Sequence, residues 1–214
     1  MEREIEIARI LLKSKAVALR PGKPFRYASG ILSPIYCDNR LLISLPRERE
    51  KIISAFLDTI KQNKINFDVV AGTATAGIPH AAWISDRLKK PMIYVRSESK
   101  DHGKENCIEG TLNKNDEAIV IEDLISTGGS VINAIKSVRS AGGKCDNCLA
   151  IFTYEMKKAL DAFKDLNCRL FTLTNFSTLV KTASLEKYVS KKDEEIILEW
   201  SVDPQGWGRK MGFE

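Results

Sequence analysis

Residues 118–130 combine the side chains best suited to bind a phosphorylated ligand. An apolar run, Ala-Ile-Val-Ile, ends in two adjacent acids, Glu122 and Asp123, and a loop of small and hydroxyl-bearing residues follows. Hydroxyls can donate hydrogen bonds to a phosphate, glycines let the backbone approach it, and the free N–H groups of a following helix favour the anion. The residues of this predicted phosphate-binding loop are Ser126, Thr127, Gly128, Gly129 and Ser130. The two acids could accept hydrogen bonds from ribose hydroxyls or hold a metal ion through water.

The same loop could instead be an ordinary turn between a strand and a helix, with capping residues. Two adjacent acids directly after four apolar residues argue against that interpretation. The Gly-Lys-Ser/Thr ending of a Walker loop is absent, and so is the G-x-G-x-x-G dinucleotide pattern. The segment therefore predicts a phosphate site of a different kind.

Two other segments could contribute to such a site. Residues 72–79 read Gly-Thr-Ala-Thr-Ala-Gly-Ile-Pro, and their small side chains allow either a close approach to an anion or a tight packing turn. Residues 97–107 are polar and lack periodicity, which is typical of a loop. This loop follows Arg96 and contains Lys100 and His102, although its charge alone would favour an ordinary solvated loop.

The alternation of apolar and polar residues predicts the elements that position these segments. Short apolar runs predict strands at residues 67–71, 91–95, 118–121, 149–153 and 169–173. Helices are expected at residues 46–61, 78–88 and 131–139. Strand and helix thus alternate from about residue 67 to 175, which predicts an α/β fold with a parallel sheet flanked by helices on both faces. Ligands of such sheets bind at the carboxyl ends of the strands.

The length of 214 residues fits a single domain with a small appendage. We expect residues 1–45 to form an N-terminal helix and a small hood, residues 46–175 the α/β core, and residues 176–214 C-terminal helices. No apolar run approaches the ~20 residues that span a bilayer. The N-terminus carries Glu2, Glu4 and Glu6, unlike a secretory signal, so a cytoplasmic location without membrane attachment is expected.

The basic residues are spread along the chain, and the net charge is only +5. This favours small anionic ligands over nucleic acid. Cys145 and Cys148 form one C-x-x-C pair, but a structural zinc ion needs four ligands and no second pair accompanies it. We therefore interpret them as ordinary buried or half-buried thiols, and His80, at the start of a helix, as structural.

Residues 118–130 resemble the motif with which the type I phosphoribosyltransferases bind phosphoribosyl pyrophosphate (PRPP). In that family the two acids contact the ribose hydroxyls and the loop binds the 5-phosphate. The resemblance implies these roles for Glu122, for Asp123 and for residues 126–130.

Three further segments are similar to those of one branch, the orotate phosphoribosyltransferases. Residues 72–79 match the pyrophosphate loop, which implies substrate contacts for Thr73, Ala74, Thr75, Ala76 and Gly77. Residues 94–103, Tyr-Val-Arg-Ser-Glu-Ser-Lys-Asp-His-Gly, resemble a mobile catalytic loop that reaches the site of the neighbouring subunit, with Arg96, Lys100 and His102 at matching positions. Residues 25–40 resemble the hood over the base and include Tyr36 and Asp38, and residues 199–208 resemble the tail of one bacterial subgroup.

The resemblance implies a homodimeric enzyme of pyrimidine biosynthesis that transfers ribose 5-phosphate from PRPP to orotate. It implies Mg²⁺ as cofactor, bound mainly through PRPP with Asp123 contributing through water. The catalytic residues would be Lys100, His102 and Asp123. Two alternatives remain open on the sequence: a phosphoribosyltransferase for another nucleobase, and a PRPP-sensing regulator without catalysis.

The chain also departs from the better-studied members. Ala28, Ser97 and Ala76 stand where many of them carry a lysine, and Tyr154 lies in the segment where some carry an arginine that contacts the base. Because the substrate base bears a carboxylate, these departures leave open which residues contact it.

Overall fold

The computed structural model describes residues 2–96 and 107–213. These residues form two compact units: the described residues between 46 and 173 make up one, and the described residues before 46 and after 173 make up the other. The expectation of a single domain stays a prediction. Within the described ranges, no helix combines the length and apolar character needed to cross a bilayer.

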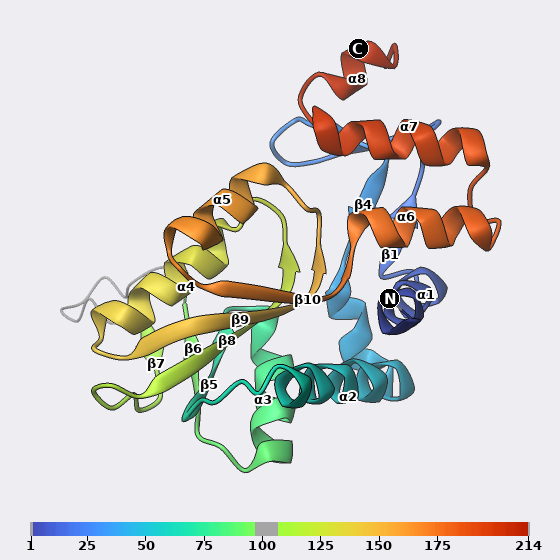
Figure 1. The fold of residues 1–214 in the computed structure, drawn as a ribbon. Coiled ribbons are helices and arrows are strands. Elements are labelled where there is room, and N and C mark those ends of the chain that lie inside the picture. The colour runs from blue at the N-terminus through green and yellow to red at the C-terminus, as the bar shows by residue number, and fades with distance from the viewer. Residues whose placement is uncertain (1, 97–106, 214) are drawn as a thin grey trace. The chain divides into compact units, whose positions relative to one another are not determined.

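A six-stranded sheet forms the centre of the larger unit (Figure 1). From one edge to the other, its strands are β10 (Arg169–Asn175), β9 (Lys144–Thr153), β8 (Glu117–Ile125), β5 (Val69–Thr73), β6 (Met92–Val95) and β7 (Ile108–Glu109). The pairs β5–β6, β5–β8 and β8–β9 are parallel, which confirms the predicted parallel core. The edge strand β7 is antiparallel to β6 and was not predicted, because two residues are too few for a periodic signal.

Helices cover both faces of this sheet, as predicted (Figure 1). On one face α3 (Gly77–Leu88) packs against β5, β6 and β8, with α2 (Pro46–Gln62) beside it. On the other face α4 (Gly129–Ser140) packs against the same strands and β9, with α5 (Lys157–Asp165) beside it. Because both faces are covered, the inner strands are almost continuously apolar; Val70, Val120 and Ile151 are fully buried.

Strands β8 and β9 extend furthest beyond their predicted ends. β8 continues to Ile125, so Glu122 and Asp123 lie within the strand and do not follow it. β9 begins at Lys144, five residues earlier than expected, and contains Cys145 and Cys148. These extensions contain polar residues, so a run of apolar residues does not predict them. In the structure, the pairing of β8 with β9 continues as far as Ile125 and Thr153.

The smaller unit holds helices and two short sheets. Its helices are α1 (Glu2–Lys13), a short 3₁₀ helix η1 (Asn39–Ser44), α6 (Phe176–Leu185), α7 (Lys191–Val202) and α8 (Trp207–Lys210). The strands are β1 (Val17–Leu19), which pairs with β4 (Ile35–Cys37), and β2 (Phe25–Arg26), which pairs with β3 (Leu32–Ser33). The indoles of Trp200 and Trp207 are buried and donate hydrogen bonds to the carbonyls of Leu32 and Ile196, as expected of packing residues.

The residues that we interpreted as structural are buried in the larger unit. Cys145 and Cys148 are fully buried in β9, and burial raises the pKa of Cys148 well above its usual value. His80 is fully buried in α3 between the rings of Phe56 and Trp83. Both interpretations are confirmed.

Candidate active site

The strand register brings two predicted site segments together. Gly72 of β5 is level with Ile121 of β8, so the following residues, Thr73 and Glu122, are neighbours at the carboxyl edge of the sheet. On the other side of β5, Thr73 is level with Val95 of β6, and the Ala74 N–H donates a 2.8 Å hydrogen bond to the Val95 carbonyl. The acids, the 73–77 loop and the start of the segment after β6 therefore share one edge.

A small pocket lies in the predicted phosphate-binding loop. Its volume is about 160 Å³, and it is lined by Glu122, Leu124, Ser126, Thr127, Gly128, Gly129, Ser130 and Val131. Pockets that enclose a whole drug-sized ligand measure roughly 300–1,000 Å³, so this pocket fits one group of a ligand, such as a phosphate. The predicted loop residues are thus brought together with the buried acid Glu122.

Glycine is required where this loop turns into α4. Gly128 precedes the helix with a φ of +82°, a conformation that other residues adopt only with strain. The N-terminus of α4 then leaves backbone N–H groups beside the pocket, where they favour an anion. The loop also packs against α5: the Ser126 hydroxyl lies 3.9 Å from the Met156 sulfur, and a Cβ on Gly128 would lie 3.4 Å from that of Ala159.

The two acids have different environments. Glu122 is only 6% exposed, and its Oε1 accepts a 3.0 Å hydrogen bond from the Asp123 N–H, whereas Asp123 itself is half-buried. Burial, followed by the charge of Asp123, raises the pKa of Glu122 from 4.5 to about 9. At neutral pH Glu122 is therefore a neutral carboxylic acid that can donate a hydrogen bond.

The 73–77 loop packs closely on the neighbouring strand. A Cβ atom on Gly77 would lie 2.4 Å from the Ile121 carbonyl oxygen, so only glycine fits at the start of α3. The Thr73 hydroxyl is buried and, in the described structure, has no aligned hydrogen-bond partner, although it is close enough to Glu122 to favour the ionised carboxyl. A buried hydroxyl of this kind suits a polar ligand at the edge of the sheet.

Arg96 directly follows β6 and forms an ion pair with Glu109 of β7. The Arg96 Nε and Glu109 Oε1 atoms are 3.2 Å apart, without the alignment of a hydrogen bond. The remaining loop candidates, Lys100 and His102, lie outside the described residues.

Tyr36 belongs to β4 of the smaller unit. It is 43% exposed, and its ring packs against Phe25 and Tyr27. Its expected contact with the substrate stays a prediction.

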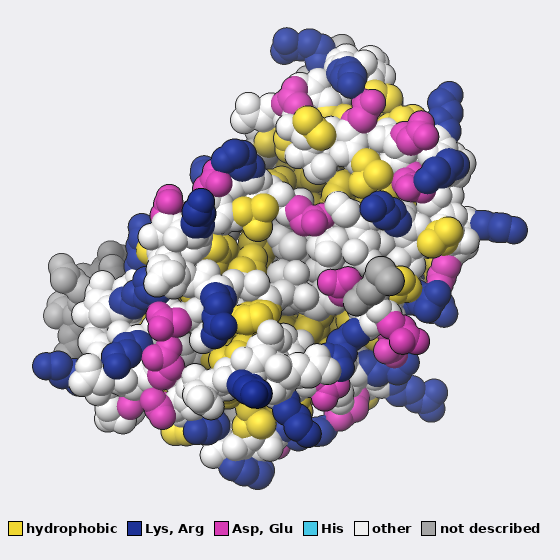
Figure 2. Space-filling model, viewed as in Figure 1, with side chains coloured by type: hydrophobic (Ala, Val, Ile, Leu, Met, Phe, Trp, Pro, Cys, Tyr) yellow, Lys and Arg dark blue, Asp and Glu magenta, His cyan; other side chains and the backbone are white. Residues whose placement is uncertain are grey.

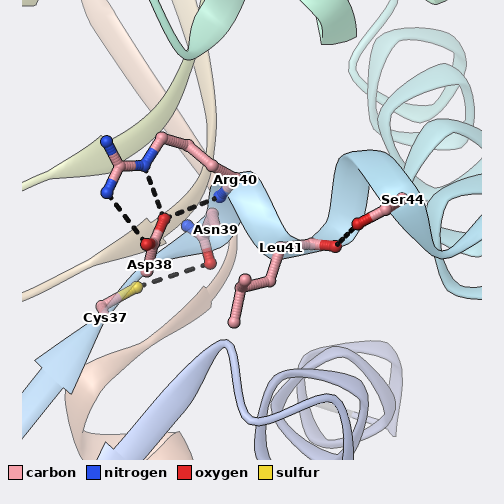
Figure 3. Close-up of polar contacts among 6 residues, drawn as sticks. All are labelled: Cys37, Asp38, Asn39, Arg40, Leu41 and Ser44. Atoms are coloured by element: carbon pink, nitrogen blue, oxygen red, sulfur yellow. Dashed lines mark hydrogen bonds and ion pairs between the residues drawn. The ribbon is translucent and has the colours of Figure 1, made fainter.

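Asp38 has a local structural role in the same unit (Figure 3). Its carboxylate accepts hydrogen bonds from the Arg40 backbone N–H at 3.2 Å and from the guanidinium at 2.7 and 2.9 Å. These bonds cap the start of η1 and lower the pKa of Asp38 below its usual value.

Leu124, Met156 and Glu109 adjoin the site but were not among the predicted site residues. Leu124 and Met156 carry no chemical signal, because an apolar residue near a phosphate loop looks like any other core residue. Glu109 could have been suspected from its charge, which complements that of Arg96 across the polar segment.

Known proteins match this chain over most of its length. A family model for the Phosphoribosyl transferase domain matches residues 44–187. The Coxiella burnetii protein named Orotate phosphoribosyltransferase is 51% identical over 207 residues, which cover 97% of this chain and 99% of that protein. A protein of the same name from Listeria monocytogenes serotype 4b is 49% identical over 209 residues, 98% of this chain and all of that protein.

Solved structures show the same fold. The orotate phosphoribosyltransferase of Aeropyrum pernix has a TM-score of 0.75 and 28% identity, over 84% of this chain and 98% of that one. UMP synthase of Leishmania donovani has a TM-score of 0.78 and 26% identity, over 93% of this chain, which spans 42% of that longer protein. These similarities agree with the sheet order and with the acids and loops at its carboxyl edge. The chain belongs to the phosphoribosyl transferase family, among the orotate phosphoribosyltransferases.

Proposed function

We propose that the protein transfers ribose 5-phosphate from PRPP to a ring nitrogen of orotate, forming orotidine 5′-phosphate and pyrophosphate. The observation that carries this proposal is the shared edge of the sheet. There the acids of β8, the phosphate-binding loop and the 73–77 loop are adjacent. PRPP, a ribose with a phosphate at one end and a pyrophosphate at the other, matches this arrangement of two predicted anion-binding loops beside the acids.

The geometry suggests a role for each segment. The 5-phosphate fits the pocket of residues 126–130, where hydroxyls and the N-terminus of α4 can donate hydrogen bonds. The backbone of residues 73–77, close to β6, would contact the pyrophosphate. Asp123 would accept hydrogen bonds from the ribose hydroxyls, and the protonated Glu122 beside it can donate one.

The acids fit a magnesium ion that is carried by the substrate. Mg²⁺ is usually held by one or two carboxylates together with phosphate oxygens and water. Asp123 is half-buried beside a neutral Glu122, and the described ranges contain no cluster of three or more His, Cys, Asp and Glu residues that could hold a metal. Asp123 would hold the ion through water, and the ion would neutralise charge on the leaving pyrophosphate.

The chain's own cations would assist the departure of pyrophosphate. The bond from the anomeric carbon to pyrophosphate loosens before orotate attacks, so positive charge develops on the sugar, as in glycoside chemistry. Arg96, with Lys100 and His102 of the predicted catalytic loop, would stabilise the negative charge on pyrophosphate. The ring nitrogen of orotate is already acidic, so no strong general base is required of the protein.

The face of the molecule shown in Figure 2 offers no support for a PRPP-sensing regulator that binds nucleic acid. On the face shown in Figure 2, Lys and Arg side chains are interspersed with Asp and Glu and form no continuous basic patch. A nucleic-acid site would require such a patch. The homodimer with a shared catalytic loop and the cytoplasmic location stay predictions.

A panel of bases tests this function. Purified protein is incubated with PRPP, Mg²⁺ and one of orotate, uracil, hypoxanthine, guanine, xanthine or adenine, and nucleotide formation is followed by chromatography. We expect product with orotate alone, and a loss of about 100-fold or more in its rate of formation with Asp123→Asn or after chelation of Mg²⁺. Product with another base would retain the PRPP site but overturn the specificity. PRPP binding without product from any base would favour the regulator.

A further inference from the structure

We propose that Glu109 is a positioning residue, which orients the Arg96 guanidinium toward the pyrophosphate of the substrate. The inference rests on the role proposed above for Arg96. It adds Glu109, which has no role in the proposed function so far. It is carried by the ion pair between the two side chains and by the place of this pair at the carboxyl edge of the sheet.

The backbone holds the two residues in a defined arrangement. Strands β6 and β7 are antiparallel, with Tyr94 level with Glu109 and Val95 level with Ile108. Beyond the last strand residue, the Arg96 N–H donates a 2.9 Å hydrogen bond to the Cys107 carbonyl. Arg96 therefore leaves β6 beside β7, and the short ladder keeps Glu109 within reach of its side chain.

The ion pair joins two partly buried side chains. Glu109 Oε1 lies 3.2 Å from Arg96 Nε, and the side chains are 24% exposed for arginine and 33% for glutamate. Because the pair is partly buried, water and salt screen its attraction less than they would screen that of a fully exposed pair. The guanidinium carries five N–H donors in a fixed planar fork that suits phosphate, so pairing with one carboxylate is compatible with binding an oxyanion as well.

The pair also lies next to the predicted pyrophosphate loop. Thr73 and Val95 are level in the parallel pair β5–β6, and Ala74 N–H donates to the Val95 carbonyl at 2.8 Å. Arg96 is the residue after Val95, so its backbone adjoins the start of the 73–77 loop. An arginine oriented in advance loses less side-chain entropy when pyrophosphate binds, which favours binding.

The opposite role for Glu109 would be competition, in which its carboxylate holds Arg96 away from the substrate. The two roles predict opposite changes in pyrophosphate affinity when the carboxylate is removed. If Glu109 orients Arg96, removal of the carboxylate weakens pyrophosphate binding; if it competes, removal tightens it. We expect weakening, because a guanidinium has five N–H donors and a single carboxylate can accept from only some of them.

The test compares full-length variants by calorimetry at fixed Mg²⁺, with pyrophosphate and ribose 5-phosphate as separate probes. The variants are Glu109→Gln, Glu109→Asp, Arg96→Ala and the double variant Arg96→Ala/Glu109→Gln. The matched control is Glu50→Gln, which removes the acid of another arginine ion pair in the same unit, Arg87–Glu50 at 2.6 Å. Thermal unfolding of every variant verifies the fold.

We expect Glu109→Gln to weaken pyrophosphate binding about tenfold, with ribose 5-phosphate binding unchanged. Glu109→Asp should lose less, because it keeps the charge, and Glu50→Gln should behave like the wild type. The double variant should bind pyrophosphate as Arg96→Ala does, because Glu109 acts through Arg96.

Three results would overturn the proposal: unchanged or tighter pyrophosphate binding in Glu109→Gln, an equal loss for ribose 5-phosphate, or additive losses in the double variant. If Arg96→Ala itself leaves pyrophosphate binding unchanged, the role proposed for Arg96 fails as well. The base panel would then still decide whether the enzyme uses orotate.

Discussion

Two adjacent acids at this site differ because of their surroundings and not because of their chemistry. Glu122 is buried between strands, whereas Asp123 is half-buried on the same strand. Burial favours the neutral form of Glu122, and the neighbouring charge of Asp123 adds to this effect. One acid can therefore donate a hydrogen bond while the other accepts.

The raised pKa of Glu122 predicts a pH-dependent stability. The folded protein keeps a proton up to about pH 9 that the unfolded chain releases near pH 4.5. The contribution of Glu122 to stability is thus complete below pH 4.5 and is lost as the pH rises toward 9. We expect Glu122→Gln to stabilise the free protein at pH 8 by about 1–3 kcal/mol relative to the wild type, since the amide stays neutral.

Urea unfolding at about pH 5 and about pH 8 measures this difference. The gap in unfolding free energy between variant and wild type should widen with pH. Parallel pH profiles for the two proteins would show that Glu122 is already ionised in the folded state.

At the scale of elements, α3 begins at a predicted substrate-binding segment and contains a buried titratable residue. Its first residue, Gly77, packs on the Ile121 carbonyl, and His80 follows one turn later. Both ring nitrogens of His80 are buried and lack hydrogen-bond partners among the described residues. Burial, with a smaller effect of the Arg49 charge, lowers the pKa of His80 from 6.5 to about 4.

This histidine predicts a loss of stability in acid. The imidazole of His80 binds a proton near pH 6.5 in the unfolded chain but only near pH 4 in the folded protein. The contribution of the neutral His80 to the free energy of unfolding is therefore complete above pH 6.5 and is lost as the pH falls to 4. At about 1.4 kcal/mol per pH unit, the full loss is roughly 3 kcal/mol. His80→Leu, of similar size and unable to ionise, should lose less stability between about pH 7 and pH 4.5.

Unfolding of both proteins by urea across that range checks the prediction. Other groups also titrate in acid, so the relevant quantity is the difference between variant and wild type. Equal losses in the two proteins would mean that His80 is protonated without cost in the fold.

At the scale of the whole molecule, the open question is whether one subunit completes the site of another. Lys100 and His102 lie outside the described residues, so their contribution rests on the resemblance of residues 94–103 to a shared catalytic loop. A loop that acts on the neighbouring site makes a specific prediction for mixed oligomers.

We expect Lys100→Ala and Asp123→Asn each to reduce turnover by about 100-fold or more as pure proteins. In a purified heterodimer, one site would carry both changes and the other neither, so about half of the wild-type activity should return. Tandem affinity tags isolate the heterodimer, and its turnover is compared with that of both parents. A heterodimer as inactive as its parents would place Lys100 in the site of its own subunit.

The contiguous parts of the site could be predicted from the sequence. The loop of residues 126–130 and the acids before it are close along the chain, so their chemistry is visible without a fold. The strand–helix alternation likewise predicted the parallel sheet, because each element has its own apolar period. The antiparallel strand β7 was missed because two residues are too few for a periodic signal. The extensions of β8 and β9 were missed because polar residues interrupt their apolar pattern.

Only the tertiary structure decided the properties that depend on neighbours from distant segments. The neutral state of Glu122 requires the strands that bury it, and no residue beside it in the chain predicts that burial. The Arg96–Glu109 pair requires β7 to return alongside β6. Residue types determine which chemistry is available, but desolvation and the pairing of side chains arise only when separate segments pack together.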